Sequence, residues 1–355
     1  MPFYSDLRRM SRSDRLRTIA GIERLRAQKG KAIPPRTLKD TLLLATWNIR
    51  DFGNEDKRAK EDGRDQPGPR LQESYYYIAE VISAFDIVAI QEVNTIEALE
   101  RVMNILGPSW EYMTTDINPT KAGNHEHMTF VYDTRKVSFE HMAGQIVTNK
   151  QQQFVRTPYY AAFQSGWFRF SLCTVHILYG DYKDTRSRIR EIDEIAGFLT
   201  KRIERTRENI ILLGDFNIIS REDKTFAPLD KHDWYVPLDF KTNVAKNKSY
   251  DQIAFKVKEG RLKRGSSKKN AGAFDFFKSV FQSRDWKEYY AVAAATGRLM
   301  DSWEKALSFP DKKPLTRQQY FKQWRTWQMS DHMPLWIELQ IDFTDDYLKR
   351  IAGAD

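Results

Sequence analysis

The alternation of apolar, strand-forming runs with helical repeats is the feature that most constrains the fold of this 355-residue chain. Runs rich in aliphatic and aromatic residues predict strands at 41–49, 86–93, 127–133, 166–178, 209–218 and 334–341. Apolar residues at helical spacing predict helices at 13–29, 71–85, 94–106 and 186–205. This alternation indicates a layered α/β domain, and the consecutive strands 127–133 and 166–178 favour a mixed sheet.

Three parts are expected along the chain. Residues 1–40 form a basic helical N-terminal extension, whose helix is ended by Gly30 and the Pro34-Pro35 pair. The main α/β domain covers 41–342, and a Gly-, Ser- and Lys-rich loop opens a basic stretch at about 258–320 that looks inserted. Residues 343–355 are expected to be a C-terminal tail.

The net charge of +9 is unevenly distributed. Residues 1–40 contain eleven Lys or Arg and four acids, and residues 256–270 contain seven and one, so these segments carry +7 and +6. The remainder therefore sums to −4. An acidic body with two basic segments suits a polyanionic partner. The alternative is that both segments are solvated loops whose charges serve solubility.

Composition excludes several classes of protein. The single cysteine, Cys173, rules out an internal disulfide and a cysteine-built metal site, and it fits a reducing compartment. No apolar run approaches the roughly 18 residues that a membrane span requires. The N-terminus also lacks the apolar region of a secretory signal. We therefore expect a cytoplasmic protein without a membrane span.

Polar, chemically capable side chains follow most of the predicted strands. In "LLGDFNII" (212–219), period two would place Asp215 and Asn217 on one face of an extended segment. The other positions of this kind are Asn48, Glu92, Glu126, His176, Asp331 and His332, with Asp251 in "SYDQIAF". Loops at strand ends are where α/β folds gather functional groups, so this recurrence predicts one shared site.

The residue types indicate the chemistry. A hard cation such as Mg²⁺ or Mn²⁺ prefers carboxylate and amide oxygens, which Glu92, Asp215, Asp331 and Asn48 offer. No Cys/His cluster has zinc spacing. A histidine held by a carboxylate is an oriented acid or base near neutral pH. Hydrolysis of a phosphodiester requires one such group to activate water, another to protonate the leaving oxygen, and positive charge on the phosphoryl oxygens.

Seven short motifs resemble one superfamily in its order along the chain. They are "WNIRDFG", "DIVAIQEV", "HEHMTFVYD", "TVHI", "LLGDFN", "SYDQI" and "SDHMPLW", and they extend over about 41–341. The chain resembles the endonuclease/exonuclease/phosphatase superfamily, and within it the deoxyribonuclease I-like branch. The resemblance implies a catalytic domain with an α/β fold, a four-layer sandwich of two packed mixed β-sheets flanked by helices.

The same resemblance implies a role for each matched residue. Asn48, Glu92, Asp215 and Asp331 would surround the divalent metal, and Asn217 would bind the scissile phosphate. His332, paired with Asp251, would activate water, and His176, paired with Glu126, would protonate the leaving oxygen. Arg50 would contact backbone phosphate. Arg186, at the start of a predicted helix, either solvates that helix or reaches phosphate.

This sequence departs from the branch in three respects. It lacks the disulfides and secretory signal of the secreted nucleases, it adds the basic extension, and it has a longer stretch between Asp251 and Asp331. Two aromatic groups, Tyr75–Tyr77 and the helically spaced Tyr320, Trp324 and Trp327, are expected to pack in the core rather than to bind a ligand.

We therefore expect an intracellular nuclease that uses Mg²⁺ or Mn²⁺ to cleave DNA, leaving a 5′-phosphate. One alternative is a phosphatase or phosphodiesterase acting on a small phosphorylated metabolite or lipid headgroup. A second is a non-catalytic nucleic-acid-binding member of the superfamily, although every position of the constellation is retained. The sequence does not identify any protein partner.

Overall fold

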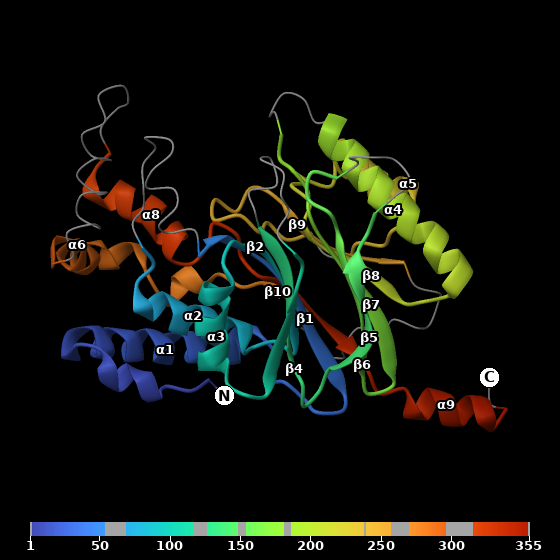
Figure 1. The fold of residues 1–355 in the computed structure, drawn as a ribbon, viewed down its shortest axis with the longest axis horizontal. Helices are drawn as coiled ribbons and strands as arrows, with labels where there is room; N and C mark the ends of the chain where they lie inside the picture. Colours follow the sequence, from blue (N-terminus) through green and yellow to red (C-terminus); the bar gives the residue numbers. More distant parts are fainter. Residues whose placement is uncertain are drawn as a thin grey trace.

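Two mixed β-sheets pack face to face and are covered on their outer faces by helices (Figure 1). This computed structural model describes residues 2–53, 69–116, 126–147, 154–180, 186–237, 239–256, 270–295 and 315–353. The arrangement confirms the four-layer α/β sandwich that the sequence predicts. Among the described residues, every helix is too short or too polar to span a lipid bilayer.

The first sheet has six strands in the order β10-β11-β1-β2-β4-β3. β1 runs parallel to β2 and antiparallel to β11, and the other pairs are antiparallel. The strand bounds are β1 Thr41–Phe52, β2 Ile87–Val93, β3 Trp110–Thr114, β4 His127–Asp133, β10 Ala271–Ala273 and β11 Leu335–Gln340.

The second sheet has five strands in the order β5-β6-β7-β8-β9, and only β7 and β8 are parallel neighbours. The strand bounds are β5 Ser138–Gln145, β6 Tyr159–Ser165, β7 Phe168–His176, β8 Ile210–Asp215 and β9 Asp251–Lys256. Cys173 is buried on β7. The sequence did not indicate β5, because this edge strand is mostly exposed and lacks apolar alternation.

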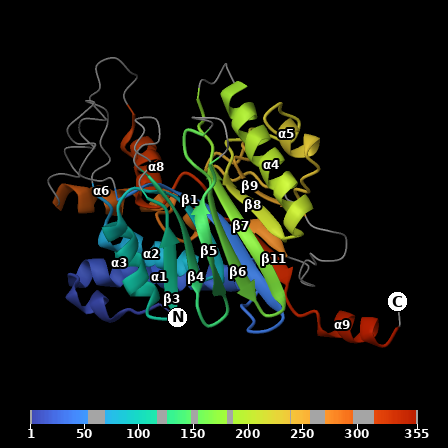
Figure 2. The ribbon, with the colours of Figure 1, turned by 45° about the vertical axis from the view of Figure 1, so that its right-hand side comes forward.

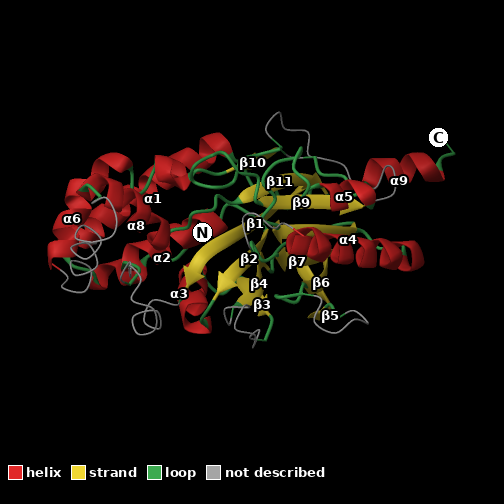
Figure 3. Cartoon of the chain, turned by 90° about the horizontal axis from the view of Figure 1, so that it is seen from above, coloured by secondary structure: helices red, strands yellow, loops and turns green. Residues whose placement is uncertain are grey.

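Helices cover the two sheets unequally (Figures 2 and 3). α1, α2, α3, α6 and α8 lie on the first sheet, whereas α4 and α5 lie on the second. The helix bounds are α1 Arg12–Ala32, α2 Gln72–Ile82, α3 Ile96–Leu106, α4 Arg186–Thr206, α5 Ala227–Lys231, α6 Trp286–Ala295, α8 Arg317–Gln328 and α9 Thr344–Ile351. The four predicted helices are therefore confirmed, with shifts of up to three residues at their ends.

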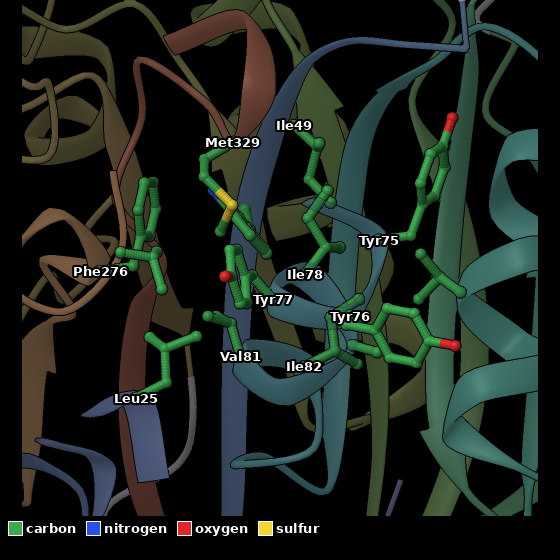
Figure 4. Packing of buried hydrophobic residues seen from close by; sticks show 14 of the residues in the cluster. Leu25, Ile49, Tyr75, Tyr76, Tyr77, Ile78, Val81, Ile82, Phe276 and Met329 are labelled. Atoms are coloured by element: carbon green, nitrogen blue, oxygen red, sulfur yellow. The ribbon is translucent and has the colours of Figure 1, made fainter. Parts of the chain in front are cut away.

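Helix α2 is the centre of the thicker helical layer. Tyr75, Tyr76 and Tyr77 are all buried, although consecutive residues point in different directions around a helix. Figure 4 shows Leu25 of α1 and Phe276 near Tyr77 and the neighbouring residues of α2. α2 therefore packs on several sides at once, and the expectation that these tyrosines belong to the core is confirmed.

Residues 1–40 are part of this layer. Ile22 and Leu25 of α1 are buried in the same apolar cluster as α2. Gly21 allows the close approach, because a Cβ atom there would lie 2.3 Å from the hydroxyl oxygen of Tyr77. Deletion of 1–40 would therefore expose one face of α2.

The stretch predicted to be inserted at 258–320 is only partly described. Its described portion contributes β10 to the first sheet and buries Phe274, Phe276 and Phe281 in the helical layer. The basic residues of 257–269 lie outside the described residues. The domain boundaries proposed from the sequence stay predictions.

Candidate active site

Strand periodicity brings several of the predicted polar residues to one place. On β1, Leu42 and Leu44 face the second sheet, so Asn48 continues on that inner face at the strand end. On β8, Leu213 packs in the same layer, and Asp215 follows it with the same parity. The same argument applies to His176 of β7 and Asp251 of β9. Residues from the two sheets therefore meet between them, at corresponding strand ends.

Glu92 reaches this inner face by a backbone distortion. Simple alternation along β2 would direct it toward the helices, because Ile90 packs there. Instead, the strand has a register shift after Ile90, and Glu92 adopts a left-handed φ of 63°. Its carboxylate accepts a hydrogen bond from the backbone N–H of Asp51, which is also left-handed (φ 45°). Non-glycine residues in this conformation are strained, and such strain concentrates at functional sites.

The "GDFN" sequence ends β8 with a close backbone approach and a sharp turn. Gly214 has φ of 133°, and a Cβ atom there would lie 2.1 Å from the carbonyl oxygen of Val175. Asn217 is left-handed (φ 53°), and its backbone N–H donates to Asp215 Oδ1. The expectation that Asp215 and Asn217 share one face of an extended segment is therefore wrong. The turn instead directs the Asn217 amide to the carbonyl oxygen of Ile177.

His332 and Asp251 form the first histidine–carboxylate pair. The Nδ1 atom of His332 is 2.9 Å from Asp251 Oδ2, and both residues are buried. The turn that carries His332 is attached to β1, because the Trp47 indole donates to the carbonyl oxygen of His332. Ser330 Oγ also donates to the carbonyl oxygen of Asn48. These contacts fix the imidazole so that Nε2 lies 3.8 Å from Asp215 Oδ2.

His176 and Glu126 form the second pair. His176 Nδ1 lies 2.8 Å from Glu126 Oε1, and its Nε2 lies 3.6 Å from Asp215 Oδ2. The buried Arg156 contacts the same carboxylate of Glu126 from another side. The two imidazoles therefore present Nε2 to the same oxygen of Asp215, and each has the carboxylate of a different residue close to its Nδ1.

Asn48 lies between the two acids expected to bind a cation. Its Nδ2 is 3.0 Å from Glu92 Oε1 and 3.0 Å from Asp215 Oδ2. Its Oδ1 is buried and has no hydrogen-bond partner among the described residues. A buried carbonyl oxygen without a donor is costly, and a cation is one way to satisfy it. The carboxylates of Glu92 and Asp215 therefore meet at the Asn48 side chain, and these three residues offer the carboxylate and amide oxygens that suit a hard divalent cation.

The electrostatics of the cluster are strongly perturbed. Burial opposes ionisation of Glu92, but His176, the Asp51 N–H and the Asn48 amide hold the pKa of its carboxyl at about 2. Burial raises the pKa of Asp215, and the nearby Asp251 carboxylate adds to the effect. For His332, burial lowers the pKa, but Asp251 and Asp215 outweigh it and hold it well above the ordinary value. Perturbations of this kind are typical of active sites.

The structure divides the candidate ligands into two groups. Within each group one ligand atom per residue lies within 4.8 Å of the others, namely Glu92, Glu126 and His176, and Asp215, Asp251 and His332. Asp331, a predicted metal ligand, is at the rim of the site. Its side chain is 42% exposed, and its Oδ2 lies 3.7 Å from Arg50 Nη1. The role of Asp331 as a ligand stays a prediction.

The two arginines predicted to bind phosphate differ in position. Arg50 lies beside Asp331 and therefore at the edge of the cluster. Arg186 is exposed at the start of α4, and its contact with substrate stays a prediction. Arg188, two residues later, is buried instead and donates to the carbonyl oxygens of Asn217 and Tyr179.

Sequence reasoning missed Arg156 and Arg188, which brace Glu126 and the Asn217 turn. Both stand among several other basic or polar residues, and no local pattern distinguishes them. The mixed spacing of "RSRIR" (186–190) predicted only a helix start. Their burial depends on segments from elsewhere in the chain, so the sequence carries no short-range signal for it.

Comparisons with known proteins agree with the fold and the motifs. No family model matches the chain. A deoxyribonuclease from Thioalkalivibrio sp. (strain K90mix) is 28% identical over 201 residues, which cover 54% of this chain and 50% of that protein. The chain thus matches about half the length of this relative.

Solved structures show the same fold at low sequence identity. An endonuclease/exonuclease/phosphatase family protein from Bacteroides thetaiotaomicron has a TM-score of 0.51 and 17% identity, covering 85% of this chain and 98% of its own. A mannosyl-6-phosphatase from Bacteroides thetaiotaomicron VPI-5482 has a TM-score of 0.50 and 17% identity, covering 84% and 99%. The resemblance to this superfamily is therefore confirmed at the level of the fold.

Proposed function

We propose that this chain, which has the fold of the endonuclease/exonuclease/phosphatase superfamily, is a divalent-metal-dependent phosphodiester hydrolase that cleaves DNA. The observation that carries the proposal is the convergence of two histidine–carboxylate pairs on Asp215. His332 Nε2 and His176 Nε2 lie 3.8 Å and 3.6 Å from its Oδ2. Two oriented acid–base groups beside a set of oxygen ligands are the parts that phosphodiester hydrolysis requires.

In this proposal the oxygen ligands bind the divalent cation. Glu92, Asp215 and the Asn48 amide would hold Mg²⁺ or Mn²⁺, with Asp331 joining from the rim. A bound cation of this type supplies charge neutralisation on phosphoryl oxygens and acidifies water. Asn217, by the family resemblance, contacts the scissile phosphate.

The histidines move the protons. Asp251 accepts at Nδ1 of His332, which leaves Nε2 as the nitrogen to take a proton from the attacking water; a cation at Asp215 would offset one of the two carboxylate charges that raise the His332 pKa and so favour the neutral imidazole. Glu126 Oε1 lies 2.8 Å from Nδ1 of His176, so Nε2 would be the nitrogen that gives a proton to the leaving oxygen. The division of labour follows the resemblance, and the geometry supports it by placing a carboxylate beside Nδ1 of each imidazole.

DNA is the favoured substrate because the curated relative is named a deoxyribonuclease and the chain has a net charge of +9. One observation favours the alternative of a small phosphoester. Three basic residues of 1–40, namely Arg17, Lys29 and Arg36, pair with buried acids of the body. The basic extension therefore offers less charge to a polyanion than its sequence suggests.

The test is a substrate panel with purified protein in Mg²⁺, Mn²⁺ or EDTA. The panel contains plasmid DNA, single-stranded DNA, RNA, bis(p-nitrophenyl) phosphate and several phosphomonoesters, including mannose 6-phosphate. We expect metal-dependent cleavage of DNA and no reaction in EDTA. Hydrolysis of a phosphomonoester at a much higher rate than DNA would replace the nuclease proposal with the small-substrate alternative.

The role of the basic stretch at 258–264 can be measured in the same preparation. Neutralising Lys258, Arg261, Lys263 and Arg264 should weaken DNA binding and flatten its dependence on salt, because fewer condensed counterions are released. Hydrolysis of bis(p-nitrophenyl) phosphate should change little. An unchanged salt dependence would mean that these charges serve solubility only.

A further inference from the structure

Helix α8 ends beside the candidate active site and is anchored there. The Gln328 side chain accepts from the backbone N–H of Leu71 and the hydroxyl of Ser74, and donates to the carbonyl oxygen of Pro69. Gln328 itself is buried. These contacts connect the last turn of α8 to the start of α2, so the α8 residues just before Gln328 have a defined position.

Two of those residues hold Arg50. The guanidinium carbon of Arg50 lies 3.6 Å from the ring centroid of Trp327, which places the cation directly against the indole. Arg50 Nη1 also donates to Thr326 Oγ1 at 2.7 Å. The Thr326 hydroxyl in turn donates to the carbonyl oxygen of Gln323, so its lone pairs face the guanidinium. Both contacts come from consecutive residues of one helix.

The backbone of Arg50 is held from the opposite side. Arg70 donates to the carbonyl oxygens of Arg50 and Asp51. Arg70 is buried, and its guanidinium lies over the ring of Phe52. Backbone and side chain of Arg50 are thus both restrained, although the side chain remains 29% exposed.

The restrained guanidinium faces the site. Its Nη1 lies 3.7 Å from Asp331 Oδ2, and Asp331 is the neighbour of His332. A guanidinium has five N–H donors in a fixed plane, and the bond to Thr326 uses one of them. The planar fork matches two oxygens of a phosphate, provided that its orientation is fixed.

We infer that Trp327 is a positioning residue, which holds the Arg50 guanidinium in place to bind a backbone phosphate adjacent to the scissile one. The inference rests on the proposed function. It also names the substrate class, because only a substrate with a second phosphate, such as a nucleic acid strand, gains from this contact. Of the helically spaced Tyr320, Trp324 and Trp327, the first two are therefore buried in the core. Trp327 is half-buried and supports Arg50.

The test compares two substrates and two variants of Trp327. Trp327→Leu should raise KM for a short DNA duplex about three- to tenfold, the range of a partly desolvated cation–π contact. The kcat should stay within about twofold, because the lost interaction is present in both ground and transition states. Trp327→Phe retains an aromatic face and should restore most of the affinity. Bis(p-nitrophenyl) phosphate has one phosphate, so its kinetics should not change.

A double-mutant cycle separates positioning from a general structural effect. Arg50→Met should raise KM for DNA more than Trp327→Leu does and reduce the salt dependence of binding by about one counterion. In the double variant, Trp327→Leu should add nothing further, because the group that it positions is gone. The matched control is Tyr290→Leu, which removes a similar stack under Arg317 at the other end of α8 (4.3 Å) and should leave KM unchanged.

The outcomes distinguish this inference from the proposed function. If wild-type protein cleaves DNA but Trp327→Leu alters neither KM nor binding, the inference is wrong and the function stands. Additive effects in the cycle, or equal changes on both substrates, would also overturn it. If wild-type protein cleaves nothing, the proposed function fails. The inference about Trp327 can then still be tested by measuring the binding of a labelled duplex. Trp327→Leu should weaken this binding in protein that retains Arg50 and should have no effect in protein that carries Arg50→Met.

Discussion

Buried charge is organised differently at the α1–α2 contact and at the strand ends of the candidate active site. At the helical contact, each buried acid has a basic partner from residues 1–40. Arg17 Nε lies 2.8 Å from Glu73 and Lys29 Nζ lies 2.6 Å from Glu80. In the segments that follow the two helices, Arg36 Nε lies 2.6 Å from Asp86. These pairs connect segments that are about fifty residues apart in the sequence.

At the strand ends, the acids face amide and imidazole groups. Glu92 and Asp215 share the amide of Asn48 and have His176 and His332 as their nearest ionisable partners. No Lys or Arg forms an ion pair with Glu92 or Asp215 within the part of the chain that the structure describes. Acids with dedicated cations serve the fold, whereas acids that converge on shared neutral donors leave room for an external cation.

Removal of residues 1–40 tests this comparison with the largest expected effect. The deletion takes away three cations from buried acids and exposes the face of α2 that Ile22 and Leu25 cover. We expect the truncated protein to lose cooperative unfolding in urea, because buried unpaired charge and lost packing both destabilise it. A truncated protein with a wild-type unfolding midpoint would show that the α1–α2 contact contributes nothing to the fold.

A single substitution, Arg17→Met, should destabilise the fold in a pH-dependent way. Breaking a buried pair costs about 3–5 kcal/mol of unfolding free energy. Burial raises the pKa of Glu73 to about 7 despite Arg17. The stability that this raised pKa contributes is therefore fully present below the pKa of a glutamate in the unfolded chain, about 4.3. It is lost as the pH rises through about 7, the pKa of Glu73 in the folded protein. Without Arg17 the pKa rises further, so the cost should be larger at pH 8 than at pH 5.

The measurement is urea unfolding of wild type and variant across this pH range, with DNA cleavage assayed below the transition. Cleavage should be close to wild type, because Arg17 is remote from the strand ends. The matched control is Arg9→Ala, which removes a partner of Asp6 whose side chains are 83% and 60% exposed. That change should have no measurable effect. A pH-independent cost for Arg17→Met would contradict this account of Glu73.

In contrast to Arg17→Met, His332→Ala should act mainly on turnover. We expect turnover to fall at least about a hundredfold, in line with loss of an acid–base group, while the protein stays folded in the absence of urea. His232→Ala is the matched control, because His232 Nε2 lies 2.9 Å from Asp193 Oδ1, a pair of the same chemistry outside the site. Turnover of the control should be unchanged. Near-wild-type turnover of His332→Ala would remove His332 from the mechanism.

The smallest expected effect is the response of the unfolding midpoint to Mg²⁺, which should differ between variants of the two regions. A cation that binds only the folded protein stabilises it by about 1.4 kcal/mol at ten times its Kd. Mg²⁺ should therefore raise the unfolding midpoint of wild-type protein, and it should not do so for Glu92→Gln. Glu80→Gln, the corresponding change at the α1–α2 contact, should lower the midpoint but retain the Mg²⁺ response. The same Mg²⁺ response in Glu92→Gln would show that the cation binds elsewhere.

The sequence determined the fold class and most of the site. Apolar period two fixed the faces of β1 and β8, and with them the inward direction of Asn48 and Asp215. The ordered motifs identified both histidine–carboxylate pairs, which the structure brings to 2.8–2.9 Å. The strand faces are local features, because a strand's periodicity and the residue at its end can be read within a few positions, whereas the two pairings came from the family resemblance.

The tertiary structure decided what depends on contacts between distant segments. Only the folded chain shows that the charges of 1–40 neutralise buried acids, that Glu92 turns inward through a left-handed residue, and that Trp327 lies against Arg50. Arg50 and Trp327 are far apart in the chain, and nothing local links them. Which cation meets which buried carboxylate is set by packing geometry and by the cost of leaving a charge unpaired, and neither is encoded within one element.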